Sequence, residues 1–225
     1  MFRGDDDMKK AIIFDMDGTL FQTNLILESA LDATFDVLRN EGKWHSETPI
    51  DQYRNIMGVP LPVVWETLCP LHSADIHKQN NKIFQQKLIE LIQLKKCALY
   101  PHVEHVLETL SQTHSLFIAS NGQTKYLNAI IETYKLERFI ENTYSIELIP
   151  SGHKSELVRK IIIENGIESG FVVGDRASDI LAAKDNQLVA IGVNFDFAQE
   201  AELLLADFII NNFKELPETI LKSLK

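Results

Sequence analysis

Reactive side chains follow three apolar runs of this 225-residue chain. The first run is followed by Asp15-Met16-Asp17-Gly18-Thr19, the second by Ser120-Asn121-Gly122, and the third by Gly174-Asp175 with Asp179 one helical turn later. If these runs are parallel strands, their carboxyl ends meet at one edge of a sheet, where open α/β sheets bind ligands. Four carboxylates, those of Asp15, Asp17, Asp175 and Asp179, would then lie close together.

Neighbouring carboxylates repel one another unless a cation neutralises them. Mg²⁺ suits such a site because it takes hard oxygen ligands and shares them with a substrate phosphate. The sequence therefore predicts a magnesium site at this edge of the sheet. Lys154, at the start of a helical pattern, could supply a fixed positive charge there.

The elements that must position these residues follow from the apolar pattern. Continuous apolar runs are typical of buried parallel strands, and they lie at 11–14, 115–119, 170–174, 188–192 and 207–210, with a weaker one at 144–146. Apolar residues at helical spacing lie between them, at 103–110, 127–134 and 157–162. Strands that alternate with helices predict an α/β fold with a doubly wound, Rossmann-like parallel sheet.

One segment interrupts this alternation. Residues 22–97 carry helical stripes and no convincing strand, whereas an ordinary crossover needs only about a dozen residues. We therefore expect an inserted helical cap domain at 22–97 and a core domain made of 1–21 and 98–225. The chain length agrees, because about 150 residues per domain gives roughly one and a half domains.

The composition excludes several classes of protein. The formal net charge is −10, which argues against a nucleic-acid binder and against a polybasic membrane anchor. No apolar run approaches the roughly 18 residues of a spanning helix. The two cysteines, Cys69 and Cys97, are too few for a disulfide framework. We therefore expect a cytoplasmic protein that binds neither nucleic acid nor membrane. We also expect it to be a monomer or a homodimer, although the composition does not decide between them.

The motifs resemble those of the haloacid dehalogenase (HAD) superfamily, and the resemblance runs from Lys9 to about Leu224. The helical insertion is similar to the family's C1 cap. One departure is that many relatives have Lys-Pro where this chain has Lys154-Ser155, so the charge is kept without the proline. The matching residues are Asp15 and Asp17 in the Asp-x-Asp motif, Ser120 after the second strand, Lys154 in the third motif, and Asp175 and Asp179 in the acidic motif.

This resemblance implies a Mg²⁺-dependent phosphatase, similar to phosphoglycolate phosphatase, that hydrolyses a small phosphorylated metabolite through an aspartyl-phosphate intermediate. Asp15 would be the nucleophile, and Asp17 the general acid and then the general base. Ser120 and Lys154 would stabilise the transferring phosphoryl group.

The resemblance also implies the ligands of the metal and of the substrate. Asp15, Asp175 and the main-chain carbonyl of Asp17 would bind Mg²⁺, and Asp179 would bind it directly or act through another group. We expect Thr19 to hydrogen-bond Asp17 and hold it in place. The residues expected to contact phosphate or substrate are Asp17, Gly18, Thr19, Asn121, Gly122 and, from the cap, Arg54.

Three alternatives remain open at this point. A pyrophosphatase or a phosphosugar mutase of the same family would use the same pair of aspartates. A non-catalytic sensor of phosphate and Mg²⁺ would keep the acidic pocket, but it has no use for a leaving-group acid such as Asp17. A dinucleotide-binding Rossmann enzyme is excluded, because no G-x-G-x-x-G follows the first strand.

Overall fold

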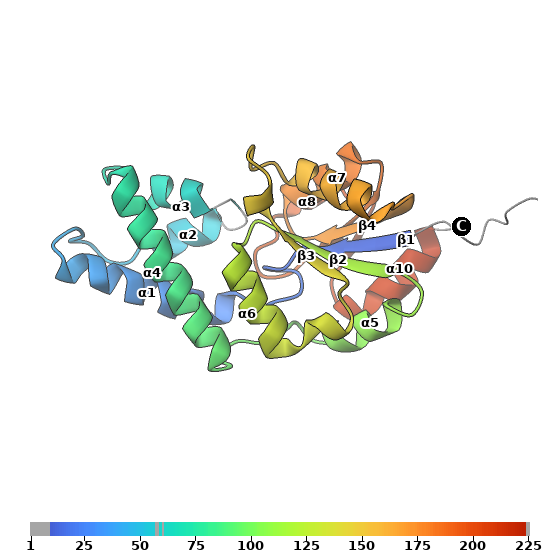
Figure 1. The fold of residues 1–225 in the computed structure, drawn as a ribbon, viewed down its shortest axis with the longest axis horizontal. Helices are drawn as coiled ribbons and strands as arrows, with labels where there is room; N and C mark the ends of the chain where they lie inside the picture. The colour runs from blue at the N-terminus through green and yellow to red at the C-terminus, as the bar shows by residue number, and fades with distance from the viewer. Residues whose placement is uncertain (1–9, 57–58, 60, 224–225) are drawn as a thin grey trace, which may run out of the picture.

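Six parallel strands form a single sheet in the computed structural model, which describes residues 10–56, 59 and 61–223 (Figure 1). Their order in space is β3-β2-β1-β4-β5-β6, with β1 near the middle. The predicted α/β fold is confirmed. The strands are β1 (Lys10–Phe14), β2 (Ser115–Ser120), β3 (Asn142–Ser145), β4 (Ser169–Gly174), β5 (Val189–Val193) and β6 (Phe208–Ile210).

Helices cover both faces of the sheet, and this burial explains why the strands are continuously apolar. From β1, Ile12 and Phe14 pack into the core shared with α5, α6 and α10. Ala11 and Ile13 face the opposite layer, under α7 and α8. The helices after the first crossover are α5 (Val103–Leu110), α6 (Thr124–Tyr134), α7 (Lys154–Asn165), α8 (Ala177–Asp185), α9 (Glu200–Leu203) and α10 (Leu216–Ser223), with short 3-10 turns at Leu136–Arg138, Ile146–Leu148 and Phe213–Glu215.

Between Thr23 and Leu94 the described residues form helices and the loops that connect them, and no strand. They lie together at one end of the molecule (Figure 1). Buried aromatic rings hold them to one another: the Trp65 ring lies 5.8 Å from that of Phe84 and 6.3 Å from that of Phe35. These helices are α1 (Asn24–Asn40), α2 (Ile50–Asn55), α3 (Leu61–Leu68) and α4 (Ala74–Gln93).

The two connections between this helical segment and the sheet run side by side. The Gln22 N–H donates to the Ala98 carbonyl at 2.9 Å, and the Tyr100 N–H donates to the Leu20 carbonyl at 2.9 Å. The Gln22 side chain also donates to the Leu99 carbonyl, at 2.7 Å. The division into a cap and a core domain stays a prediction, and its outermost residues, 1–9 and 224–225, lie outside the described part of the chain.

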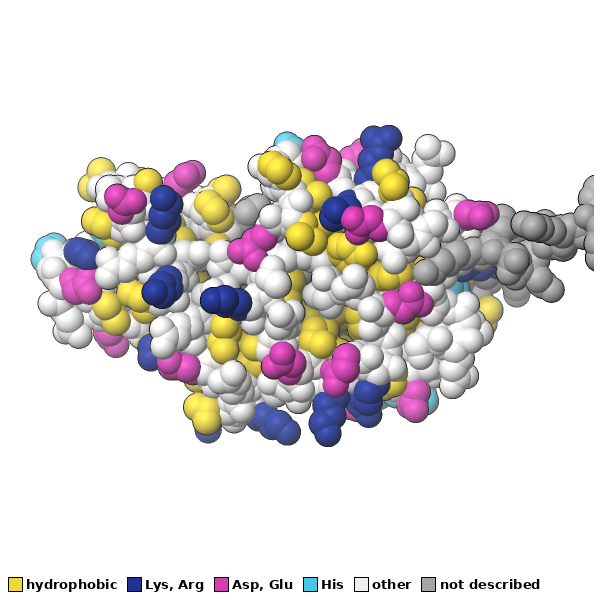
Figure 2. Space-filling model, viewed as in Figure 1, with side chains coloured by type: hydrophobic (Ala, Val, Ile, Leu, Met, Phe, Trp, Pro, Cys, Tyr) yellow, Lys and Arg dark blue, Asp and Glu magenta, His cyan; other side chains and the backbone are white. Residues whose placement is uncertain are grey.

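Charged side chains of both signs are interspersed over the face shown in Figure 2, on the helical segment as well as on the sheet and its helices. None of the described helices has the length and apolar character needed to cross a membrane. Cys69 and Cys97 are both buried free thiols.

Candidate active site

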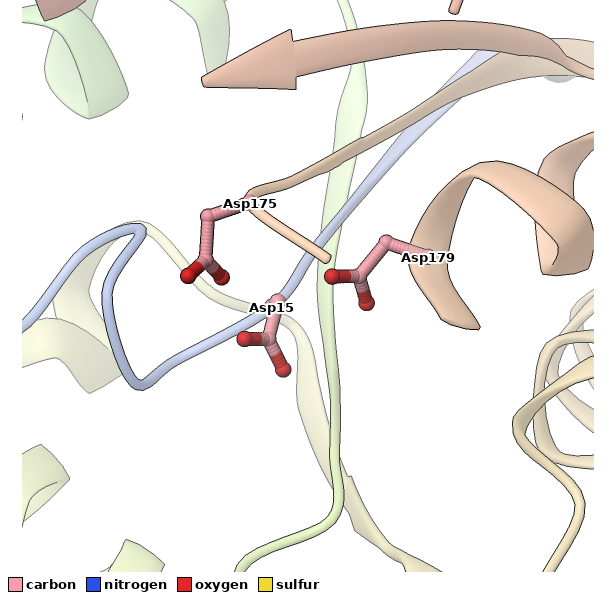
Figure 3. A group of neighbouring side chains, drawn as sticks. All are labelled: Asp15, Asp175 and Asp179. Carbon is pink, nitrogen blue, oxygen red and sulfur yellow. The ribbon is translucent and has the colours of Figure 1, made fainter. Parts of the chain in front are cut away.

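Three aspartates converge where two neighbouring strands end (Figure 3). Asp15 follows β1 directly and Asp175 follows β4, and the register that pairs Phe14 with Val173 brings the two strand ends to one level. The Asp15 N–H extends this pairing by donating to the Val173 carbonyl at 2.9 Å. Asp179 reaches the same place from the first turn of α8. One carboxylate oxygen from each aspartate lies within 4.8 Å of the other two.

Lys154, the first residue of α7, is the cation inside this group. Its Nζ lies 2.5 Å from Oδ1 of Asp15 and forms a second ion pair with Oδ1 of Asp179. All four side chains are buried. Three carboxylates against one ammonium group leave a formal charge of −2, which is costly to bury without another cation.

The excess of negative charge in the cluster also shifts the pKa values of its members. Burial raises the pKa of Asp15 to about 7; Lys154 opposes this shift, and the carboxylates of Asp179 and Asp17 add to it. Burial, with the charges of Asp15 and Asp179, raises the pKa of Asp175 well above its usual range. For Lys154, burial lowers the pKa, but the Asp15 and Asp179 carboxylates outweigh it and raise the pKa overall. Asp15 and Asp175 therefore favour the entry of a further positive charge.

The oxygens available in the cluster fit a hard divalent cation. Oδ2 of Asp175 is buried and has no hydrogen-bond partner among the described residues. Oδ2 of Asp179 accepts the Arg176 N–H at 3.1 Å, and its Oδ1 pairs with Lys154. Both oxygens of Asp179 are thus engaged, which leaves Asp15 and Asp175 as the carboxylates better suited to bind an ion directly.

Asp17 is held by two hydroxyl groups rather than by the expected one. Thr23 Oγ1 and the Tyr126 hydroxyl both donate to Oδ1 of Asp17. The prediction that Thr19 would hold Asp17 is wrong, because Thr19 Oγ1 donates instead to Oδ1 of Asp175, at 3.3 Å. The loop after Met16 turns back on itself and buries Thr19 completely. Burial raises the pKa of Asp17, and the two donated hydrogen bonds oppose that rise.

A sequence-family comparison decides the identity of this fold and site. The model of the haloacid dehalogenase-like hydrolases matches residues 12–193, which is most of the chain. This chain is a haloacid dehalogenase-like hydrolase. The match covers both β1 and β4, and with them the three converging aspartates.

Individual relatives of this haloacid dehalogenase-like hydrolase are distant but cover most of it. It is 25% identical to a phosphoglycolate phosphatase of Vibrio cholerae, over 95% of this chain and 98% of the relative. It is 24% identical to a 5'-nucleotidase of Pseudomonas aeruginosa, over 85% of this chain and 86% of the relative. The crystal structure of a predicted phosphatase from Clostridium acetobutylicum superposes with a TM-score of 0.79 at 21% identity, covering 96% of this chain and 100% of that one.

A single pocket of this hydrolase collects many of the residues singled out from the sequence. Thr19 and Asp175 lie behind it, both almost fully buried. Gly18 packs against Asp175 so closely that a Cβ on it would lie 2.5 Å from Oδ2. The residues from the sequence prediction that line the pocket are Asp15, Asp17, Ser120, Asn121, Gly122, Lys154 and Asp179.

Two predicted phosphate contacts have other positions or partners in the structure. Arg54 lines a separate pocket beside Asp196, and its guanidinium lies 3.7 Å from Oε2 of Glu28. Arg54 therefore does not line the pocket that contains Asp15 and Asp17. The Gly122 N–H, expected to face phosphate, donates to Ser120 Oγ at 2.9 Å.

Sequence reasoning missed Tyr126, Thr23 and the residues that α2 and α4 bring to the pocket. A signal for Tyr126 was available, because it lies in the first turn of the helix that follows Ser120, next to the sheet edge where ligands bind. Tyr53 and Phe84 had no such signal. Which face of a helix turns toward a distant strand end depends on how the helices pack.

Proposed function

We propose that this protein is a Mg²⁺-dependent phosphatase that hydrolyses small phosphorylated metabolites through a phosphoaspartyl intermediate on Asp15. The observation that carries the proposal is the buried cluster of Asp15, Asp175 and Asp179 around Lys154, with a formal charge of −2. Asp17 stands beside it on the wall of the same pocket. Membership of a hydrolase family and relatives named as phosphatases support it.

The proposed chemistry divides between the two aspartates of the first loop. The Asp15 carboxylate attacks phosphorus while the bond from phosphorus to the ester oxygen breaks. Asp17 gives its proton to that departing oxygen and so releases the alcohol. Asp17, now a carboxylate, then takes a proton from a water molecule that attacks the phosphoaspartate, which frees inorganic phosphate and restores Asp15.

The remaining residues of the pocket hold and balance charge. Lys154 neutralises part of the negative charge on Asp15 and on the phosphoryl oxygens. Ser120 lies at the carboxyl end of β2, where its hydroxyl can donate to a phosphoryl oxygen. Asp15, Asp175 and the main-chain carbonyl of Asp17 would hold Mg²⁺, which supplies the positive charge that the cluster lacks.

Phosphate release from p-nitrophenyl phosphate tests the proposal directly. We expect steady turnover with Mg²⁺, none with EDTA, and none in Asp15→Asn even when Mg²⁺ is present. Asp36→Asn is the matched control, because Asp36 is exposed on α1 and its carboxylate pairs with the surface residue Arg39. Asp15→Asn activity equal to that of Asp36→Asn would refute the nucleophile, and turnover unaffected by EDTA would refute the metal.

The intermediate itself is tested by trapping it. A brief reaction with radiolabelled substrate, quenched in acid, should leave label on the wild-type protein that neutral hydroxylamine removes, as expected of an acyl phosphate. Asp15→Asn should carry no such label. Asp17→Asn should hydrolyse the intermediate more slowly, because it lacks the base that activates water. If Asp17→Asn turns over substrate and still carries no label, direct attack of water on phosphorus would be favoured.

A further inference from the structure

The wall of the pocket that faces the aspartates is uncharged. In the part of the chain that the structure describes, the helical segment contributes no lysine, arginine, aspartate or glutamate to this wall. Its side chains are aromatic, aliphatic or amide: Tyr53, Val59, Leu61, Phe84, Gln85 and Leu88.

Among the described residues, two cations line the pocket, Lys154 of α7 and Arg176 before α8, and both are paired. Lys154 is held by Asp15 and Asp179. Arg176 is paired with Glu202, whose carboxylate accepts from Nε at 2.9 Å and from Nη2 at 3.1 Å. Because Glu202 balances the guanidinium, the Arg176–Glu202 pair adds no net charge to the pocket.

Neutral hydrogen-bonding groups are nevertheless present on the wall. Tyr53 is 5% exposed and lines the pocket, and its hydroxyl is a neutral hydrogen-bonding group. Its ring packs edge-on against Phe84, with centroids 5.6 Å apart. Gln85 and Gln123 also line the pocket, joined by a 2.7 Å hydrogen bond from Gln85 Nε2 to Gln123 Oε1.

We propose that this pocket selects phosphomonoesters whose leaving group is uncharged, and that it rejects esters in which a carboxylate or a second phosphate lies near the reacting phosphate. This inference rests on the proposed phosphatase function and narrows its substrate class. An uncharged leaving group gains contact with the apolar wall and a hydrogen bond from Tyr53. A second anion would be desolvated in a pocket whose described side chains offer it no unpaired cation, because Lys154 and Arg176 are already paired.

Pairs of substrates that differ mainly in this charge provide the test. Glycerol 3-phosphate and 3-phosphoglycerate form one pair, and the open-chain esters sorbitol 6-phosphate and 6-phosphogluconate form the other. In each pair we expect the uncharged leaving group to give at least about a tenfold higher kcat/KM, which corresponds to roughly 1.4 kcal/mol. Equal values in both pairs, or a preference for the carboxylates, would overturn the inference.

A charge placed on the wall gives a second, independent readout. Gln85→Lys puts a cation into the pocket, and we expect it to shift the ratio of kcat/KM values toward 3-phosphoglycerate by at least about tenfold. Gln86→Lys is the matched control, because Gln86 is the next residue of α4, is exposed and does not line the pocket. A Gln85→Lys ratio equal to that of Gln86→Lys would show that this wall does not meet the leaving group.

Turnover of p-nitrophenyl phosphate separates this inference from the proposed function. Its hydrolysis by the wild type, with loss in Asp15→Asn, establishes the phosphatase whatever the paired substrates show. If the paired substrates then show no preference, only the inferred selectivity fails. If no phosphomonoester is hydrolysed, the proposed function fails, and the inference fails with it.

Discussion

The Tyr126 hydroxyl donates a hydrogen bond to Oδ1 of Asp17, the same oxygen that accepts from Thr23 Oγ1. With two donors on Oδ1, a proton carried by Asp17 has to sit on Oδ2. Thr23 and the first turn of α6 thereby fix which oxygen of the proposed general acid carries its proton.

Tyr126→Phe removes one of these donors and keeps the ring. We expect kcat for p-nitrophenyl phosphate to fall about tenfold, the equivalent of one hydrogen bond of roughly 1.4 kcal/mol, with little change in KM. Because the lost hydrogen bond lowers the pKa of Asp17, the limb of the pH–rate profile that reports Asp17 should move to higher pH. Tyr134→Phe is the control, since its hydroxyl donates to the Cys97 carbonyl, away from the aspartates. Equal kinetics and pH profiles in the two variants would contradict the role of Tyr126.

In Asp175→Asn we expect Mg²⁺ to leave the melting temperature unchanged. A ligand at a hundred times its dissociation constant stabilises a protein by about 2.7 kcal/mol, so the wild type should melt at a higher temperature with Mg²⁺ than with EDTA. The variant should show no such difference. In EDTA it should also melt above the wild type, because one of three crowded carboxylates has lost its charge. Thermal unfolding with and without the metal measures both effects, and an unchanged Mg²⁺ response in the variant would remove Asp175 from the site.

We expect Gly18→Ala to displace the Asp175 side chain in addition to straining the backbone. Gly18 has a φ of 77°, where an alanine costs roughly 1 kcal/mol, and its new Cβ would lie 2.5 Å from Oδ2 of Asp175. Gly42→Ala is matched for strain, with a φ of 66°, but nothing lies within 4 Å of its Cβ. Activity should therefore fall more than about tenfold in the first variant and stay near wild type in the second. A similar loss in both would mean that backbone strain alone explains the effect.

His114 should contribute to acid sensitivity. It is half-buried, its Nε2 has no hydrogen-bond partner in the described part of the chain, and burial, helped by Lys10, lowers its pKa below the ordinary 6.5. The unfolded chain therefore binds a proton at His114 more readily than the folded one. The stability that His114 contributes is present above about pH 6.5 and is lost as the pH falls through the folded pKa.

Denaturant unfolding of His114→Gln between pH 7.5 and 5 measures this contribution, using roughly the range that the ordinary histidine pKa defines. The variant should lose less stability than the wild type over this range. His105→Gln, at an exposed position of α5, serves as the reference. If the wild type and His114→Gln lose the same free energy of unfolding over this pH range, folding does not lower the pKa of His114 and the prediction is wrong.

The sheet and the acidic cluster were largely predictable, because strands buried on both faces leave unbroken apolar runs. The run at 115–119 became β2 (Ser115–Ser120), and the run at 170–174 became β4 (Ser169–Gly174). The convergence of Asp15 with Asp175 then follows from parallel pairing alone.

What the sequence could not give is the direction of side chains in loops and on helix faces. Thr19 was expected on Asp17, but the turn after Met16 carries it to Asp175. Arg54 was expected at the substrate, but the packing of α2 turns Tyr53 into the pocket and leaves Arg54 beside Glu28. A rotation of one residue along a helix is enough to exchange such neighbours.

The central place of β1 in the sheet sets an order for folding during synthesis. β1 is made first, yet its two neighbours are β2 and β4, so it has no strand to pair with until much of the chain has emerged. The helices α1, α3 and α4 pack against one another and find their partners within a short stretch of sequence. We therefore expect the helical segment to fold early, while β1, which precedes Asp15, is still unpaired. The site would be assembled only after β4 and the first turn of α8 have been made, because they carry Asp175 and Asp179 to Asp15.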